Sequence, residues 1–400
     1  MDLYDDIDLI AGPHRPPHVY IHVPFCRSKC SYCDFASVAG AGSDTVEAVF
    51  AGLRSDIRRC AEWALPGLVE TVYVGGGTPT HVAEHTVRLV GFALEQLPLH
   101  GPVEVTVEAN PESLSFEIAG ELARAGASRI SVGVQSFDDR VLRLLGRPHS
   151  ADEAEDACRS VVRSGLELSL DLMCGVPGQT LSSWQDSIDR ALRTGARHVS
   201  VYPLAVEPGT ALAVAVDTEL VEAPDPDVAA DMMLMAEEVL GRAGLARYEV
   251  ANYAVPGAES RHNTAYWTGR EYVGIGPAAH GMLDAATARA LGMLETADAD
   301  VARVRYAETG DIESWLTAAR TRDVETLTVL ETQREDVMLG LRLSRGVRDA
   351  EVRDAGLAET MRALVADGLV QLDDETVRWR VTTKGWLLGN EVFGRVWTAE

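Results

Sequence analysis

Lysine is almost missing from this 400-residue chain: only Lys29 and Lys384 stand among its 36 basic residues. The 61 acidic residues outnumber the basic ones, so the formal net charge is −25. Such a chain lacks the cationic surface that nucleic acid phosphates or an anionic membrane would require. We therefore expect no nucleic acid partner. The scarcity of lysine itself indicates a GC-rich coding sequence rather than a function.

Long apolar runs are also lacking, since no segment has the roughly 20 consecutive apolar residues that a membrane-spanning helix needs. The first ten residues are acidic where a secretory signal would be basic. We expect a cytoplasmic protein without a transmembrane span, and leave peripheral contact with a membrane open. Aromatic residues make up only 6%, but 46% of the chain is hydrophobic, which excludes a mostly disordered protein.

Strand and helix patterns alternate through the first two-thirds of the chain. The strand candidates, rich in Val, Ile, Leu or Tyr and bounded by Gly or Pro, are 19–24, 71–74, 103–108, 129–135, 167–172 and 198–204. Helix candidates with apolar residues three and four positions apart are 45–63, 83–97, 115–125, 151–164 and 181–194. Six such units predict an α/β fold with a parallel sheet, either doubly wound or curled into a partial barrel.

Polar residues stand at the ends of several predicted strands. Glu108, Gln135 and Asp171 lie at or near the carboxyl ends of otherwise apolar runs. Barrel active sites form at that rim, because the loops that follow the strands converge there. A single such residue could equally end a strand or cap a helix. Several together favour a functional rim.

The pattern changes at about Ala285. Residues 285–325 are rich in Ala, Arg and acidic residues, and we expect them to be helical or loosely ordered. Helical patterns then precede a hairpin around Asp373–Thr376, which predicts a small α+β winged-helix-like domain. We thus expect an N-terminal segment (1–18), a barrel (19–284) and a C-terminal domain (285–400). The acidic surroundings favour a structural or partner-docking role over DNA binding.

Three of the six cysteines lie within eight residues: Cys26, Cys30 and Cys33. In a reducing compartment this spacing indicates metal binding or catalysis rather than disulfides. A structural zinc site needs four protein ligands, and only His22 is at hand as a fourth. A four-iron cluster held by three cysteines keeps one iron free for an exchangeable ligand such as S-adenosylmethionine (SAM). The sequence favours the iron–sulfur cluster, with zinc as the alternative.

The CxxxCxxC spacing at the end of a first barrel strand resembles the radical SAM superfamily. Gly75-Gly76-Gly77-Thr78-Pro79, after the second strand, is similar to its segment for the SAM amino group, although a plain turn would also explain three glycines. Within the superfamily the chain resembles the HemN-like branch and its HemW heme chaperone family, over about residues 19–395. Further segments that carry the resemblance are Gly133–Phe137, Leu145–His149, Asp171–Pro177, Tyr202–Ala205 and Glu207–Gly209.

The resemblance implies a partial (β/α)6 radical SAM barrel and assigns roles to residues. Cys26, Cys30 and Cys33 would hold a [4Fe–4S] cluster. The residues that would line its SAM are Tyr20, Gly76, Gly77, Thr78, Glu108 and Ala205. Those that match contacts of a second SAM in related coproporphyrinogen oxidases are Tyr32, Gln135, Arg147 and Asp171. Whether this chain binds a second SAM is left open.

A histidine segment, Arg261-His-Asn-Thr-Ala-Tyr-Trp267, follows the last strand-like run. It resembles the HNxxYW motif that marks the HemW family, where the motif is linked to heme binding. His262, Asn263, Tyr266 and Trp267 would then contact heme near the barrel mouth, since imidazole binds heme iron and aromatic rings pack on a porphyrin. A glycine-rich loop is expected at 272–281, and its His280 is a second candidate ligand or a hydrogen-bonding residue of the site. For a lone histidine a structural role is the alternative.

The resemblance implies a heme chaperone that carries a SAM-liganded cluster and transfers heme to acceptors such as respiratory hemoproteins. A homodimer is left open. The alternative is a radical SAM enzyme, either an oxygen-independent coproporphyrinogen III oxidase or a HemN-like methyltransferase. Phe35 stands where the oxidase has a further cysteine, and the stretch before the first strand is short, so both features count against the oxidase. The methyltransferase stays open, as does SAM cleavage.

Overall fold

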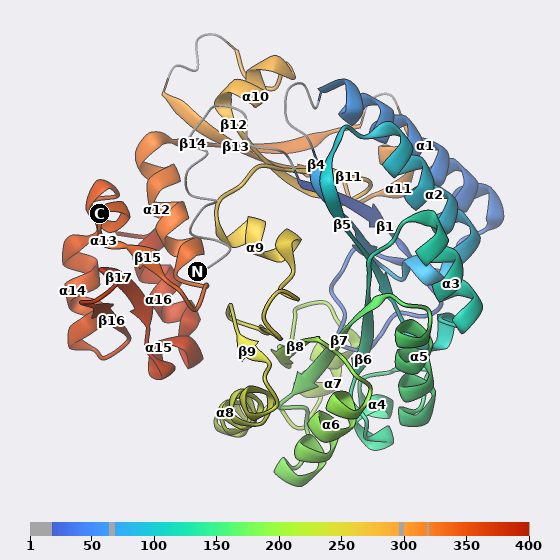
Figure 1. The fold of residues 1–400 in the computed structure, drawn as a ribbon, viewed down its shortest axis with the longest axis horizontal. Coiled ribbons are helices and arrows are strands. Elements are labelled where there is room, and N and C mark those ends of the chain that lie inside the picture. The colour runs from blue at the N-terminus through green and yellow to red at the C-terminus, as the bar shows by residue number, and fades with distance from the viewer. Residues whose placement is uncertain (1–17, 64–68, 296–299, 318–319, 400) are drawn as a thin grey trace.

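A computed structural model of the protein describes residues 18–63, 69–295, 300–317 and 320–399 (Figure 1). Apart from His18, the predicted N-terminal segment lies outside these residues. Six parallel strands follow one another in chain order across a single sheet, which makes the fold a partial barrel rather than a doubly wound sheet. These strands are β1 (His18–Val23), β4 (Val69–Gly76), β5 (Leu99–Ala109), β6 (Arg129–Gln135), β7 (Glu167–Cys174) and β8 (His198–Pro203).

Helices cover the convex face of this sheet (Figure 1). They are α1 (Ser43–Trp63), α2 (Ala83–Gln96), α3 (Phe116–Ala125), α5 (Ala151–Arg163) and α6 (Leu181–Arg193), with the short α4 (Asp139–Leu144) before α5. Capping boxes at Ser150 and Thr180 begin α5 and α6, because each side chain satisfies a free backbone N–H of the first turn. Trp184 of α6 is fully buried against the sheet and donates its indole N–H to the Met232 carbonyl at 2.8 Å.

The sheet continues beyond the barrel at both edges. After β8 come α7 (Ala211–Asp217), α8 (Pro226–Arg242), and the antiparallel strands β9 (Ala246–Arg247) and β10 (Asn252–Ala254). Helix α9 (Arg261–Trp267) lies within the concave side of the sheet (Figure 1). Strand β11 (Tyr272–Ile275) then pairs parallel with β1. The three strands β12 (His280–Asp284), β13 (Val301–Glu308) and β14 (Arg322–Thr328) follow antiparallel.

The expectation that residues 285–325 are helical or loosely ordered is wrong. Besides the short helices α10 (Ala285–Ala290) and α11 (Ile312–Trp315), this stretch holds β13 and most of β14. Strand pairing therefore crosses the boundary that we predicted at 285. The arginines that suggested a helix have partners on another element, since Arg303 and Arg305 each donate to the Glu335 carboxylate at 2.6 Å.

The C-terminal part forms a separate apolar core around Val352, Met361 and Leu364. The hairpin predicted around 373–376 is confirmed, because β16 (Val370–Asp373) and β17 (Arg378–Val381) pair antiparallel. The remaining elements of this winged-helix-like unit are α12 (Val329–Gly340), β15 (Val347–Arg348), α13 (Asp349–Asp354), α14 (Ala358–Ala366), α15 (Thr383–Leu387) and α16 (Gly389–Trp397).

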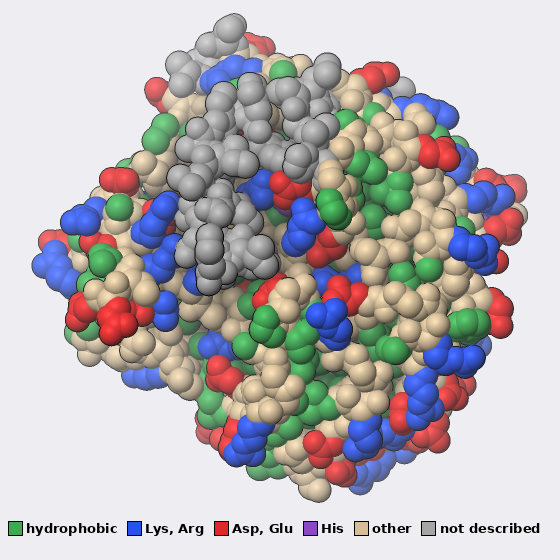
Figure 2. Space-filling model, in the orientation of Figure 1, with side chains coloured by type: hydrophobic (Ala, Val, Ile, Leu, Met, Phe, Trp, Pro, Cys, Tyr) green, Lys and Arg blue, Asp and Glu red, His purple; other side chains and the backbone are tan. Residues whose placement is uncertain are grey.

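Charged side chains of both signs are interspersed over the face shown in Figure 2. Among the described residues, no helix is long and apolar enough to cross a bilayer.

Candidate cofactor site at the barrel mouth

The three clustered cysteines lie on the loop that leaves β1. Two short strands, β2 (Phe25–Cys26) and β3 (Val38–Ala39), pair with each other and close this loop over the carboxyl ends of the parallel strands. Cys26, Cys30 and Cys33 are half-buried free thiols. All three border one cavity of about 120 Å³.

The thiols fit a cluster better than a single ion. In the part of the chain that the structure describes, no three His, Cys, Asp or Glu side chains are placed to bind one metal ion. In a cubane cluster each cysteine binds a different iron, so its thiolates spread around a larger body. His22, the candidate fourth zinc ligand, has both ring nitrogens engaged, with the Ala36 carbonyl at 2.8 Å and the Tyr20 hydroxyl at 3.0 Å.

Most of the predicted SAM residues meet at the cysteine cavity. Gly76, Gly77, Thr78 and Glu108 line it, and so do all four candidates for a second SAM: Tyr32, Gln135, Arg147 and Asp171. Two residues do not join them. Tyr20 lines a neighbouring cavity. Ala205 is exposed on the loop after β8, outside the residues that line these cavities.

Gly75 and Gly76 end β4, and Gly77 follows it. Their backbone lies close to other parts of the protein, and Gly76 and Gly77 also line the cavity. A Cβ on Gly75 would lie 2.7 Å from the Glu108 carboxylate carbon, and one on Gly77 would lie 2.7 Å from the Phe25 carbonyl. Gly76, at a φ of 111°, has no room for a side chain because its Cβ would meet the His22 ring. These contacts give the glycine run a packing role that neither the predicted approach to a ligand nor the alternative of a plain turn included.

Glu108 occupies the centre of the mouth. Its carboxylate accepts the Gly76 N–H at 2.9 Å and the Tyr73 hydroxyl at 2.8 Å. Burial raises the pKa of Glu108 to about 7. Asp171 is similar, since burial raises its pKa to about 6. Gln135 sits in the left-handed backbone region at a φ of 66°, a strain that commonly marks functional sites.

A second, larger cavity of about 690 Å³ lies beside the cysteine loop. Tyr266 and Trp267 of the histidine segment line it, together with His280. Its other walls come from the barrel, from β11 to β13 and from α12: Tyr20, His22, Asp34, Phe35, Ala36, Gly76, Glu108, Tyr272, Ala278, Met282, Arg305, Glu335, Met338 and Leu339. Phe35, Gly76 and Glu108 border both cavities, so the two spaces adjoin at the cysteine loop.

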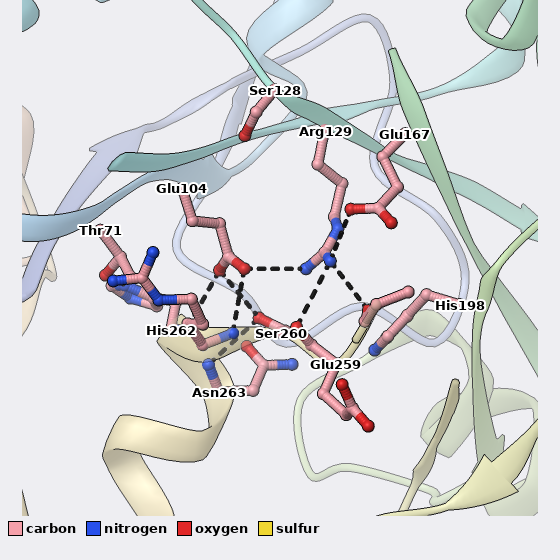
Figure 3. A network of polar contacts seen from close by, with 12 residues as sticks. Thr71, Glu104, Ser128, Arg129, Glu167, His198, Glu259, Ser260, His262 and Asn263 are labelled. Carbon is pink, nitrogen blue, oxygen red and sulfur yellow. Dashed lines mark hydrogen bonds and ion pairs between the residues drawn. The ribbon is translucent and has the colours of Figure 1, made fainter. Parts of the chain in front are cut away.

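His262 lies elsewhere than expected. We predicted it near the barrel mouth, but it is buried at the amino-terminal ends of the strands (Figure 3). Its Nδ1 bonds Thr71 Oγ1 at 2.7 Å, and its Nε2 bonds the Tyr266 hydroxyl at 2.8 Å. Neither ring nitrogen is free for iron in this arrangement. Asn263 is also turned from the large cavity, and lines the barrel lumen instead.

Glu104 holds this end of the barrel together, although the sequence did not single it out. Its carboxylate accepts the backbone N–H groups of Arg261 and His262, both at 3.0 Å, and so neutralises the start of α9. Arg129 bridges Glu104 at 3.3 Å and Glu167 at 2.8 Å (Figure 3). Because α9 carries Tyr266 and Trp267, this network positions one wall of the large cavity.

The glycine-rich loop that we expected beside heme is partly strand. Gly274 lies in β11, where a Cβ would collide with the His280 carbonyl. Gly276 is equally confined, since its Cβ would lie 2.6 Å from the His22 carbonyl. These glycines serve close packing of the backbone rather than approach to a flat ligand.

Burial of His262 predicts an acid-sensitive fold. Burial lowers its pKa from 6.5 to about 3, so between these values the unfolded chain binds a proton that the folded chain excludes. Stability from this group is complete above pH 6.5 and falls as the pH drops. From pH 7 to pH 5, wild type should lose about 2 kcal/mol more unfolding free energy than His262→Gln. Urea titrations at both pH values measure the unfolding free energies, and His81→Gln, at an exposed position, is the control. Equal losses of unfolding free energy in wild type and His262→Gln would contradict a lowered pKa of His262.

Comparison with known proteins agrees with this geometry. Family models match the chain as the Radical SAM superfamily over residues 20–191 and as the HemN C-terminal domain over residues 327–388. The structure of coproporphyrinogen III oxidase (HemN) from Escherichia coli, a radical SAM enzyme, superposes with a TM-score of 0.76 at 21% identity. That superposition covers 98% of this chain and 92% of the oxidase, and it shows a shared fold.

Relatives of higher identity span almost the whole chain. The heme chaperone HemW of Mycobacterium tuberculosis is 37% identical over 96% of this chain and 95% of its own length. HemW of Lactococcus lactis is 33% identical over 95% of this chain and 97% of its own length. A mitochondrial relative from Bos taurus, radical S-adenosyl methionine domain-containing protein 1, is 34% identical over 93% of this chain and 87% of its own length.

Fold, cysteine loop and C-terminal unit together define a radical SAM protein of the HemN type. Within that class, the chain belongs to the HemW heme chaperone family. The predicted fold class and family are thereby confirmed.

Proposed function

We propose that this protein is a heme chaperone that holds heme in the 690 Å³ cavity and passes it to acceptor hemoproteins. The lining of that cavity carries the proposal. Tyr266, Trp267 and Tyr272 supply aromatic faces, and Met282 and Met338 supply adaptable apolar contacts. A flat apolar macrocycle suits such walls, and the volume lies in the range of ordinary ligand sites.

The polar groups of the cavity suit the rest of the ligand. His280 is exposed and borders both this cavity and an adjoining one of about 490 Å³, so we assign the axial imidazole to it. Arg305 also borders both and would face ligand carboxylates, while Glu335 at 2.6 Å and Glu325 at 2.7 Å hold it in place. Exposed His280 and Phe35 keep the site reachable, as transfer to another protein requires.

We further propose that Cys26, Cys30 and Cys33 hold a [4Fe–4S] cluster whose open iron takes SAM. When bound and reduced, such a cluster supplies one electron to the sulfonium of SAM. The chain's own part is to orient SAM. Gly76 at the end of β4 and Thr78 on the loop that follows would line its site. Glu108 offers a carboxylate held by the Gly76 N–H and the Tyr73 hydroxyl. The candidates for a second SAM surround the same cavity.

A cavity-filling substitution tests the heme site. Met338→Trp on α12 should occupy part of the large cavity and weaken heme binding about tenfold, equivalent to about 1.4 kcal/mol. Hemin titration followed at the Soret band measures it. Leu220→Trp, at a position 81% exposed and outside the lining residues, is the matched control. Unchanged affinity in Met338→Trp would place heme elsewhere.

The second candidate function is a radical SAM enzyme, and the observation that supports it is the fold shared with the oxidase. Wild-type protein tests this enzyme activity when it is reconstituted with cluster and SAM and then given coproporphyrinogen III under strict anaerobiosis. We expect no protoporphyrinogen, because Phe35, exposed beside the cysteine cavity, stands where the oxidase has a cysteine. Sustained conversion would make the oxidase the better assignment.

A further inference from the structure

A network of three side chains connects two of the clustered cysteines. Arg147 Nη1 donates to Cys30 Sγ at 3.3 Å, and Thr78 Oγ1 donates to Cys26 Sγ at 3.6 Å. Asn110 lies between these donors. Its Oδ1 accepts from Arg147 Nη2 at 2.6 Å, and its Nδ2 donates to Thr78 Oγ1 at 2.8 Å. One amide therefore holds both groups that donate to sulfur.

The chemistry of the donors fixes how this amide is turned. A guanidinium only donates, so the amide oxygen of Asn110 must face Arg147 and its nitrogen must face Thr78. Thr78 then accepts from Asn110 and has its single proton left for Cys26 Sγ. Reversing the amide would place its NH2 group against the Arg147 guanidinium, which cannot accept, and would draw the Thr78 proton away from Cys26 toward the amide oxygen.

Neighbouring residues support the network of Arg147, Asn110 and Thr78 by a further hydrogen bond, by leaving space for Asn110 and by excluding water. Arg147 Nη2 also donates to the Gly133 carbonyl at 2.6 Å. Gly133 leaves the space that Asn110 occupies, since a Cβ there would lie 2.7 Å from Asn110 Oδ1. Thr78 is 3% exposed and Arg147 is 9% exposed, so water competes little for these bonds.

Hydrogen bonds and positive charge at cluster thiolates stabilise the more negative, reduced state, and so raise the reduction potential. Low exposure strengthens the effect, because the local dielectric is low. A higher potential eases one-electron reduction by an external donor. It also makes the reduced cluster a weaker electron donor.

We propose that Asn110 is a positioning residue that, by orienting Thr78 and Arg147 toward Cys26 and Cys30, raises the reduction potential of the bound cluster. The inference rests on the proposed cluster and is independent of heme. The sequence did not single out Asn110, which stands two residues after Glu108 in the segment that closes β5.

The test is a potential titration of the cluster in reconstituted protein without SAM or heme. Dithionite with mediators supplies one electron per cluster, and electron paramagnetic resonance measures the reduced form. Asn110→Ala, Thr78→Val and Arg147→Gln should all lower the potential. At the potential where wild type is half reduced, the reduced-to-oxidised ratio of Arg147→Gln should fall about tenfold, equivalent to about 59 mV for one electron.

Conservative variants separate this effect from damage to the fold. Thr78→Ser keeps the donor hydroxyl and Arg147→Lys keeps the charge, so both should stay closer to wild type than Thr78→Val and Arg147→Gln. Arg143→Gln is the matched control, because it removes the same charge from an exposed position of α4. It should leave the potential unchanged.

Three results would overturn the proposal. The first is a wild-type potential in fully loaded Asn110→Ala and Thr78→Val. The second is a folded Thr78→Val that assembles no cluster while Thr78→Ser does, which would assign the network to assembly. The third is absence of iron uptake by wild type, and iron analysis identifies this as failure of the proposed cluster itself.

Discussion

Replacing Cys26, Cys30 and Cys33 together by Ala should leave the protein colourless after anaerobic reconstitution with iron and sulfide. Every thiol that borders the 120 Å³ cavity is then gone, and thiolates are the ligands that iron–sulfur clusters use. Iron per chain should fall at least about tenfold, since even outer-shell changes weaken metal binding by about 10- to 100-fold. Iron analysis and visible absorbance measure the loss, and SAM binding should be lost with the cluster.

The barrel should still fold without these thiols. The three cysteines are half-buried on a loop at the mouth, whereas the main core lies between the sheet and its helices. Thermal unfolding should therefore change little. Cys158→Ala is the control, because it deletes a fully buried thiol on α5 and should leave iron uptake intact. Wild type that binds stoichiometric zinc and no iron would refute the cluster assignment.

The parallel barrel could be predicted because its strands are short apolar runs bounded by Gly or Pro, and amphipathic helix patterns lie between them. The strands added after the barrel could not. In β14, a single residue, Leu327, is buried, so its sequence carries almost no apolar alternation. In β13, Arg303 and Arg305 interrupt the pattern, and their partner Glu335 lies about 30 residues further along the chain. Only the packed structure shows why these arginines belong in a strand.

The cysteine site was predictable from local spacing, whereas the surroundings of His262 were not. Cys26, Cys30 and Cys33 lie on one loop within eight residues, so their closeness in space follows from their closeness in the sequence. The partners of His262 are remote: Thr71 lies 191 positions away, and Glu104 lies 158 away. A motif match reports that the residues belong together, but not which of them face the cavity.

Heme ligation separates the two candidate histidines. We expect His280→Ala to shift the Soret band and change the spin state, and to weaken heme binding about tenfold or more. His280 is exposed and borders both larger cavities, so its imidazole would reach heme in the proposed site without rearrangement of the barrel. Optical titration with hemin and electron paramagnetic resonance of the ferric complex provide the measurement.

His262→Gln should behave differently. His262 bonds Thr71 at 2.7 Å and Tyr266 at 2.8 Å, so in the proposed heme site it would act as a positioning residue through Tyr266. Its loss should reduce affinity while the Soret position and spin state stay those of wild type. If His262→Gln changes the spectrum and His280→Ala does not, the axial ligand is His262. Helix α9 would then have to release its bonds to Glu104 before heme could bind, and loosening that helix by Glu104→Gln should speed heme uptake.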